Sequence, residues 1–303
     1  MKTTIRIGTR DSQLALWQAH TVQEQLRSLG YGTKIISVKS TGDLLLNKPL
    51  YELGITGIFT KTLDIAMINR EIDIAVHSMK DVPTRLPKGI VQSAVLPRAN
   101  TQDVLIYKEL DFLNHTGTIA TGSLRRRAQW LNKYPYHTVT DLRGNVNTRL
   151  QKLRDNSWNG AIFAKAGLER IQVLPENHID LDWMIPAPAQ GAMVVVTMEH
   201  DTFSTEAVQK LNDFPTEIST HIEREFLQVL EGGCTAPIGA LATLNQDTIE
   251  FRGILLSLDG KRKITVEKSI PAKDYLNFGK ACALEVLNNG GREMMAGIKN
   301  ELA

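Results

Sequence analysis

The sequence predicts a protein of the α/β class that ends in a small α+β domain. Two stretches of the chain alternate short β-type runs with amphipathic helical patterns, and such alternation is typical of parallel-rich sheets covered by helices. After about residue 216 a helix is followed by three strands and two more helices, which indicates an α+β domain. We therefore expect three domains: residues 1–97 with 193–214, residues 101–189, and residues 216–303.

The first stretch begins with a strand and an amphipathic helix, and either Asp11 or Ser12 is placed to cap that helix. The expected elements are, in order, a strand at 5–8, a helix at 14–29, a strand at 34–38, a helix at 59–68 and a strand at 72–76. Within this stretch, residues 41–57 contain three glycines and one proline but little periodicity. We expect a mobile loop there, because long loops inside compact domains are often functional.

The second stretch repeats the pattern. Its expected strands are 118–121, 138–140 and 161–164, and its expected helices are 124–133, 146–154 and 165–171. The proline-containing residues 185–192 look like a hinge that returns the chain to the first domain, where residues 193–198 form another strand. The C-terminal part then has a helix at 217–230, strands at 238–243, 249–256 and 263–269, and helices at 273–287 and 292–301.

Bulk composition narrows the range of functions. The 303 residues are 22% charged and 42% hydrophobic with a formal net charge of +2, which gives no general attraction to nucleic acid. Two cysteines do not make a disulfide framework, and no paired spacing suggests a metal site. The N-terminal residues read as a strand and not as a signal peptide, and no apolar run approaches the roughly eighteen residues of a membrane span. We therefore expect a cytoplasmic protein without a metal.

Cationic residues follow the ends of four predicted strands. In an open α/β sheet, ligands bind beyond the carboxyl ends of the strands, beside helix N-termini. The residues found there are Arg10 and Ser12 after the first strand, Ser123, Arg125 and Arg126 after 118–121, Arg143 and Arg149 after 138–140, and Lys165 and Arg170 after 161–164. A single arginine of this kind is more often a solvated surface charge. Four such turns on two sheets favour a site for a polycarboxylate or phosphate, since guanidinium groups bind these anions bidentately.

Two further residues could carry chemistry. Asp81 follows a predicted strand among cationic neighbours, where it could stabilise a developing cation or pass a proton, or simply cap a turn. Cys234 lies between a glycine pair and Pro237, a setting that favours an exposed thiol and a covalent attachment point. The alternative is a small buried side chain, which describes Cys282 on its apolar helix face better. His77 is more often a satisfied histidine at a strand end than a metal ligand.

Several segments resemble, in the same order along the chain, the porphobilinogen deaminase family. They read His-Ser-Met-Lys-Asp-Val-Pro at 77–83, Ser-Leu-Arg-Arg at 123–126, Leu-Arg-Gly-Asn-Val at 142–146 and Glu-Gly-Gly-Cys at 231–234, with further matches at 6–10, 14–18 and 188–192. The resemblance spans essentially the whole chain. It implies two domains like those of type II periplasmic binding proteins and a small third domain, in agreement with the predicted organisation.

The resemblance implies an enzyme of tetrapyrrole (haem) biosynthesis with a dipyrromethane cofactor, attached to Cys234 through a thioether. Four porphobilinogen units are added head to tail, each with loss of ammonia, and hydrolysis then releases hydroxymethylbilane. Asp81, Lys80 and Arg10 match catalytic positions of the family. Asp81 would bind pyrrole N–H groups, stabilise positive charge and move protons.

The resemblance also implies what the cationic residues bind. Every pyrrole carries an acetate and a propionate group, and cationic side chains bind such carboxylates. The positions that match the family's cofactor-binding residues are Cys234, Asp81, Lys80, Thr121, Ser123, Arg125, Arg126, Gln190 and Gly191. Those that match its substrate-binding residues are Arg10, Ser12, Gln18, Arg143, Arg149 and Arg170. We expect a monomer that binds porphobilinogen, has no nucleic-acid or membrane partner, and hands its product transiently to uroporphyrinogen-III synthase.

Four positions depart from the commonest family pattern. Thr56 and Thr62 stand where lysine and glutamate are usual, and Asn147 and Ala189 stand where glycine is usual. Because Thr56 cannot supply a cation, we hypothesise that Lys48 or Lys61 takes over the contacts of the loop at 41–57.

Two other functions fit parts of the sequence. A non-enzymatic solute-binding module shares the two-domain architecture, but it predicts an export signal or lipid anchor and has no need for a reactive thiol. A cysteine hydrolase needs a histidine partner for Cys234, and the nearby His221 would lie on a helix as a surface residue. The sequence favours the deaminase over both.

Overall fold

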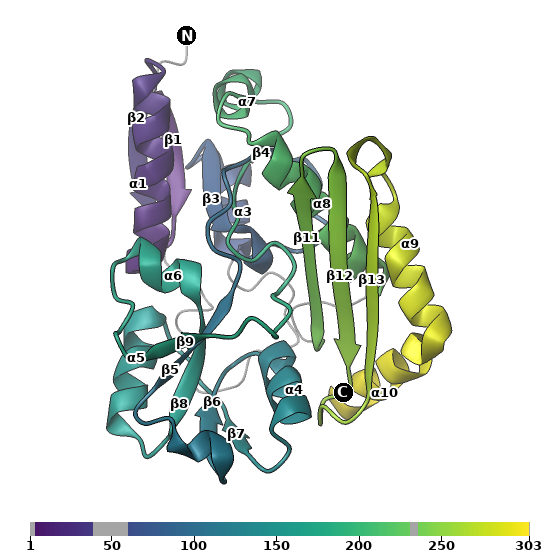
Figure 1. The fold of residues 1–303 in the computed structure, drawn as a ribbon. Coiled ribbons are helices and arrows are strands. Elements are labelled where there is room, and N and C mark those ends of the chain that lie inside the picture. The colour runs from purple at the N-terminus through teal and green to yellow at the C-terminus, as the bar shows by residue number, and fades with distance from the viewer. Residues whose placement is uncertain (1–3, 39–59, 231–235, 303) are drawn as a thin grey trace. The chain divides into compact units, whose positions relative to one another are not determined.

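The computed structural model describes residues 4–38, 60–230 and 236–302 (Figure 1). The loop expected at 41–57 and the cysteine at 234 lie outside the described residues. Contacts between Cα atoms divide the chain into two compact units. Among the described residues, unit 1 comprises 4–38, 60–99 and 191–218, and unit 2 comprises 100–190, 219–230 and 236–302.

Unit 1 contains a five-stranded mixed sheet in the order β2-β1-β3-β10-β4. Its strands are β1 (Thr4–Thr9), β2 (Gly32–Ser37), β3 (Ile74–Ser78), β4 (Ile90–Val95) and β10 (Met193–Met198), and its helices are α1 (Gln13–Ser28), α3 (Lys61–Ile68) and α7 (Thr202–Gln209). The strands β2, β1 and β3 are parallel, whereas β10 is antiparallel to both β3 and β4. The carboxyl ends of β1 and β3 therefore lie side by side at one edge of the sheet.

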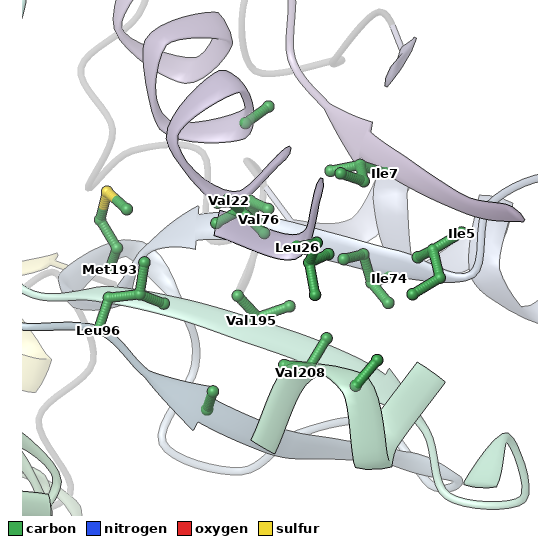
Figure 2. Close-up of a cluster of buried hydrophobic side chains, with 13 residues drawn as sticks. Ile5, Ile7, Val22, Leu26, Ile74, Val76, Leu96, Met193, Val195 and Val208 are labelled. Carbon is green, nitrogen blue, oxygen red and sulfur yellow. The ribbon is translucent and has the colours of Figure 1, made fainter. Parts of the chain in front are cut away.

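The core of unit 1 follows from alternation along the strands (Figure 2). Ile5 and Ile7 of β1 point to the same face, where Val22 and Leu26 of α1 pack against them. Gly8 points to the opposite face, and a Cβ atom at this position would meet Leu63 of α3. Each fully buried aliphatic side chain contributes roughly 1.5–3 kcal/mol, so this cluster fixes α1 relative to the strand ends that it follows.

Unit 2 contains a second five-stranded sheet in the order β7-β6-β8-β5-β9. Its strands are β5 (Asp103–Tyr107), β6 (Thr118–Ala120), β7 (Thr138–Thr140), β8 (Gly160–Ala164) and β9 (His178–Asp180), and its helices are α4 (Leu124–Lys133), α5 (Val146–Asp155) and α6 (Lys165–Arg170). Again three strands are parallel, and the next strand, β5, is antiparallel to both of its neighbours. The two five-stranded sheets therefore have the same pattern of parallel and antiparallel strand pairing.

A three-stranded antiparallel sheet completes unit 2. It consists of β11 (Ile238–Asn245), β12 (Thr248–Leu256) and β13 (Lys263–Pro271), followed by α9 (Phe278–Val286), a π-helical turn (Leu287–Gly291) and α10 (Arg292–Leu302). Helix α8 (Phe214–Val229) leads into this part of the chain. Ile254 and Leu256 of β12 pack against Ala128 of α4 and Ile185, so this sheet and α4 share a small apolar cluster.

The predicted α/β class with parallel-rich sheets and a small C-terminal α+β part is confirmed. Strands β4, β5 and β9 and helix α7 were not expected from the sequence. The helix expected at 273–287 begins only at Phe278, because Asn277 adopts a left-handed conformation (φ 62°) that interrupts a helix. The three-domain boundaries stay a prediction, and unit 2 joins residues 100–190 with 219–230 and 236–302.

Within the described part of the chain, no helix has the length and apolar character needed to span a membrane.

Candidate active site

Strand β1 delivers Arg10 and Ser12 to the carboxyl edge of the sheet in unit 1. The Ser12 hydroxyl caps α1 by accepting a hydrogen bond from the Ala15 N–H at 3.3 Å, as one of the two predicted caps. Thr9 Oγ1 donates to the Ala15 carbonyl at 2.9 Å and fixes the turn from the strand into the helix. Arg10, between these two anchors, is half-buried.

Strand β3 delivers Lys80 and Asp81 to the same edge. A single 3-10 turn, Met79–Asp81, follows the strand and leaves both side chains half-buried. The turn is held because the Met79 N–H donates to the Ala192 carbonyl at 3.0 Å. Gln18 of α1 donates through Nε2 to Ser78 Oγ at 2.9 Å, so the helix after β1 is tied to the end of β3. The predicted residues Arg10, Ser12, Lys80 and Asp81 thus follow two adjacent strand ends, and the predicted Gln18 on α1 is tied to one of them through Ser78.

His77 lies at the end of β3 and is buried. Burial, and then the positive charge of Arg10, lower the pKa of His77 to about 4, so its imidazole is neutral near pH 7. No group of three or more metal-ligating side chains that could hold an ion occurs among residues 4–38, 60–230 and 236–302.

In the segment 189–191, the chain passes from unit 2 into unit 1. The Gly191 carbonyl accepts a hydrogen bond from the Ala99 N–H at 3.1 Å, within unit 1. Gln190, within unit 2, donates through Nε2 to the Thr101 carbonyl at 2.8 Å and to Asp103 Oδ1 at 3.0 Å. The Ala189 N–H donates to Glu223 Oε2 at 2.6 Å. Every residue of this segment is therefore held by its own unit.

In unit 2, Thr121 and Ser123 form the turn between β6 and α4. The Thr121 N–H continues the pairing with β7 by donating to the Thr140 carbonyl at 2.9 Å. Ser123 Oγ caps α4, and its N–H donates to Thr121 Oγ1 at 3.3 Å. This local arrangement agrees with the helix start predicted at residue 124, and it fixes the orientation of the first turn of α4.

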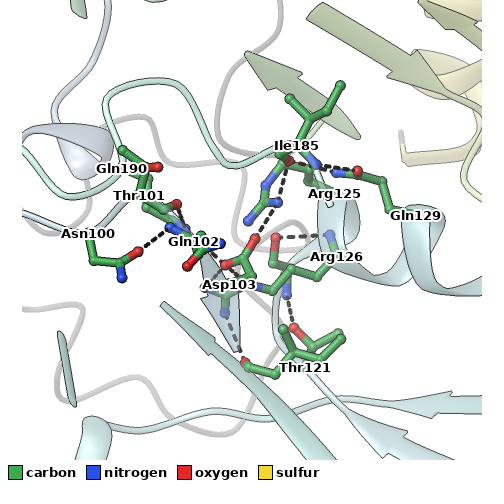
Figure 3. A network of polar contacts seen from close by, with 12 residues as sticks. Asn100, Thr101, Gln102, Asp103, Thr121, Arg125, Arg126, Gln129, Ile185 and Gln190 are labelled. Carbon is green, nitrogen blue, oxygen red and sulfur yellow. Dashed lines mark hydrogen bonds and ion pairs between the residues drawn. The ribbon is translucent and has the colours of Figure 1, made fainter. Parts of the chain in front are cut away.

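The first turn of α4 carries Arg125 and Arg126, which both bind the carboxylate of Asp103 (Figure 3). Arg125 Nη1 lies 2.7 Å from Asp103 Oδ2, and Arg126 Nη2 lies 2.8 Å from Oδ1. Burial alone would raise the pKa of Asp103, but the two guanidinium groups outweigh it and hold this pKa far below its ordinary value. Asp103 was not singled out from the sequence, because only the antiparallel pairing of β5 with β8 brings it beside α4.

The remaining predicted arginines follow β7 and β8 along the chain: Arg143 in the turn after β7, Arg149 on α5 and Arg170 at the end of α6. Arg143 is buried, and burial lowers its pKa although Asp141 opposes the effect. Burial also lowers the pKa of Arg170 to about 10, against the opposing charge of Glu169, so the group stays charged near pH 7. Arg149 Nε donates to the Gly144 carbonyl at 2.7 Å. Partly desolvated guanidinium groups favour carboxylate partners, and this donor set fits a ligand rich in carboxylates.

Other predicted positions have different surroundings. Lys165 pairs with Asp180 at 2.6 Å, within unit 2. Asn147 lies in the first turn of α5 and Lys61 begins α3, whereas Lys48, Thr56 and Cys234 lie outside the described residues. His221 pairs with Glu225 at 3.4 Å on α8, in keeping with a partly exposed helix residue.

Two family models match the chain. The model described as "Porphobilinogen deaminase, dipyromethane cofactor binding domain" matches residues 5–206, and "Porphobilinogen deaminase, C-terminal domain" matches residues 218–288. Together they cover most of the chain, on both sides of the segment at 189–191.

Curated relatives named porphobilinogen deaminase match over nearly the full length. The protein of Nitratiruptor sp. is 39% identical, with 97% of this chain and 96% of the relative covered. That of Chloroherpeton thalassium is 41% identical, with 93% and 91% covered. Among solved structures, the periplasmic VFT2 domain of Bordetella pertussis BvgS aligns with 69% of this chain and 86% of that domain at 12% identity, with a TM-score of 0.44.

The matched segments include the strand ends that carry Arg10, Asp81, Arg125 and Arg143, and the relatives extend over almost the whole sequence. The chain belongs to the porphobilinogen deaminase family.

Proposed function

We propose that the chain condenses four porphobilinogen molecules head to tail, with loss of ammonia, onto a dipyrromethane held by Cys234, and then releases hydroxymethylbilane by hydrolysis. The observation that carries this proposal is the position of Asp81 and Arg10 at the carboxyl ends of two adjacent parallel strands. This edge is where ligands bind in open α/β sheets. It combines a carboxylate that can accept protons with a cation that can bind an acidic substrate.

Residues of unit 1 would bind the substrate and move its protons. Arg10, Ser12 and Gln18 hold the carboxylates and the amine-bearing side of porphobilinogen. Asp81 accepts pyrrole N–H groups, stabilises the positive charge that develops as ammonia leaves, and takes up the proton released after bond formation. Lys80 lies beside Asp81 in the same 3-10 turn and adds a positive charge that can bind a substrate carboxylate.

Residues of unit 2 would hold the cofactor and the growing chain. When bound, the dipyrromethane supplies the free pyrrole carbon to which substrate units are added. Two opposite charges 4 Å apart attract by roughly 4 kcal/mol at an effective dielectric constant near 20, and desolvation removes part of this. Arg143 and Arg170 are already partly desolvated in the protein, so less of that cost remains when they bind carboxylates.

The wider setting of the enzyme is also part of the proposal. Three domains, with residues 1–97 and 193–214 in the first, 101–189 in the second and 216–303 in the third, agree with the three sheets. We infer a cytoplasmic monomer that passes its linear product to uroporphyrinogen-III synthase before the product cyclises.

The Asp81→Ala variant tests the catalytic assignment. It should fold and carry the cofactor, but the rate of porphobilinogen consumption should fall by about a hundred-fold or more, because the proton acceptor and charge partner is lost. Glu71→Ala, an exposed carboxylate just before β3, is the matched control and should react at the wild-type rate. Retained turnover in Asp81→Ala would show that Asp81 is not the catalytic carboxylate.

A further inference from the structure

The buried carboxylate of Asp103 is a charged group that the proposed reaction does not use. Its side chain is fully buried, and Arg125 and Arg126 are 4% and 5% exposed. Burying one carboxylate and two guanidinium groups is costly unless each is paired and hydrogen-bonded. A chain that needed only a stable core could place apolar residues here. Stability alone therefore does not account for the three buried charged groups, and we expect them to have a further role.

Each oxygen of Asp103 has its own partners. Oδ2 accepts from Arg125 Nη1 at 2.7 Å, and Oδ1 accepts from Arg126 Nε at 2.9 Å and from Gln190 Nε2 at 3.0 Å. Asp103 therefore contacts three of the positions that match cofactor-binding residues of the family. It does so from β5, a strand that carries none of those positions.

Backbone carbonyls complete the restraint of both guanidinium groups. Arg125 Nη1 also donates to the Ile185 carbonyl at 2.8 Å, and Arg126 Nη1 donates to the Ile162 carbonyl at 3.0 Å. Ile185 is in turn held by Gln129, through hydrogen bonds of 2.9 and 2.8 Å. Neither arginine can turn about its side-chain bonds without breaking a bond to Asp103.

The net positive charge of Asp103, Arg125 and Arg126 together favours the binding of an anion. One carboxylate and two guanidinium groups carry a net charge of about +1, since guanidinium groups stay protonated in proteins. Arg125 Nε is buried and has no hydrogen-bond partner among the described residues. Without Asp103, the two cations would repel each other and rotate toward water.

We propose that Asp103 is a positioning residue for cofactor loading: it holds Arg125 and Arg126 in the orientation in which they bind the carboxylates of the dipyrromethane. This inference rests on the proposed function. Asp103 does not touch the ligand itself, and it acts through the two arginines. The two guanidinium groups hold the pKa of Asp103 far below its ordinary value, so the carboxylate is ionised near pH 7.

The test compares cofactor loading in Asp103→Asn with that in wild type. Intact mass gives the fraction of purified protein that carries two extra pyrrole units, and mass against time after porphobilinogen is added gives the loading rate of the remainder. Loading should slow by about ten-fold or more in Asp103→Asn, because small displacements of binding groups cost this much. Far-UV circular dichroism should match wild type.

Asp73→Asn is the matched control. Asp73 is another buried aspartate that binds an arginine, with Arg6 Nη2 2.7 Å from its Oδ1, but it lies before β3 at the opposite edge of the sheet in unit 1. It should load cofactor at the wild-type rate. Asp103→Glu is the second variant: it keeps the charge but displaces it by one methylene, and it should also load slowly.

The outcomes separate this inference from the function on which it rests. A wild type that never gains two pyrrole units contradicts the proposed function. A wild type that gains them, with a folded Asp103→Asn that loads within two-fold of its rate or faster, overturns the role of Asp103 alone. The role is equally overturned when Asp103→Glu is folded and loads normally, or when neither variant folds, because Asp103 would then serve stability only.

Discussion

Ala189 adopts a backbone conformation that favours glycine. Its φ is 61°, in the left-handed region, and its side chain is fully buried. This explains in physical terms why glycine is usual at this position in the family that the sequence resembles. The chain tolerates alanine because the Ala189 N–H is bound by Glu223, whose other oxygen accepts from the Ala242 N–H at 2.8 Å.

The backbone strain at Ala189 can be measured by substitution. In Ala189→Gly, relief of roughly 1 kcal/mol of strain offsets the roughly 0.5–1 kcal/mol entropic cost of glycine, so stability should stay within about 1 kcal/mol of wild type. Ala189→Val should destabilise by about 3 kcal/mol, because a β-branched residue is strained in this region and the site is filled. Urea unfolding checks both values.

Ala192→Val is the control for crowding at Ala189. Ala192 is also buried, but its φ is not among the positive values, so valine there adds volume without left-handed strain. An equal loss of stability in the valine variants of Ala189 and Ala192 would mean that the backbone conformation contributes nothing.

At the scale of elements, the tip of the β12–β13 hairpin supports the helix that carries Arg125 and Arg126. Asn132 of α4 donates through Nδ2 to the Gly260 carbonyl at 2.7 Å. Gly260 has a φ of 74°, and a Cβ atom there would meet the Ala128 carbonyl oxygen and lie 2.9 Å from the Asn132 backbone nitrogen. The hairpin therefore packs directly against the outer side of α4.

Gly260→Ala should weaken this contact. Left-handed strain and a clash with backbone atoms should together lower the free energy of unfolding by about 2 kcal/mol or more. Gly290→Ala isolates the strain, because Gly290 also has a positive φ of 97° but its Cβ would meet nothing closer than Ile264 Cδ1 at 3.9 Å. Urea unfolding should show the larger loss of unfolding free energy in Gly260→Ala. Equal losses in the two variants would mean that the hairpin tip does not pack closely against α4.

Local patterns predicted most helices and the parallel strands, and for α1 they also predicted two candidate caps, one of which is the cap observed. Ser12 and Ser123 cap the helices that they precede, since capping depends on residues within one turn. Strand β4 was missed because a bulge places Ser93 opposite the bond between Val195 and Val196, which breaks the alternation along Ile90–Val95. The three-residue strand β9 is too short to show a period.

The position of candidate residues was predictable where a strand end leads straight to a charged side chain, as at Arg10 and Asp81. It was not predictable where the partner comes from a distant strand. Arg125 and Arg126 were predicted as anion-binding residues, but their internal partner Asp103 is found only through the pairing of β5 with β8. Sequence patterns record spacing along the chain, whereas ion pairing depends on tertiary neighbours.

At the scale of the whole molecule, two compact units carry different parts of the chemistry. Unit 1 holds Arg10 and Asp81, which we propose bind and process the substrate, after β1 and β3. Unit 2 holds the buried arginines that follow β6 and β7, and the half-buried Arg170 at the end of α6. The formal net charge is only +2, so the overall composition does not favour an anionic ligand. What favours one is the local clustering of arginines in the turns and helices that follow the strands. The proposed reaction requires a covalent anchor for the polycarboxylate that these cations bind.

The intact mass of the purified protein tests that anchor most directly. Wild type should exceed the mass of its sequence by two linked pyrrole units, and Cys234→Ser, prepared in the same way, should show the mass of its sequence alone. A wild type that stays unmodified after incubation with ample porphobilinogen, or a Cys234→Ser protein that keeps the excess, would contradict the account.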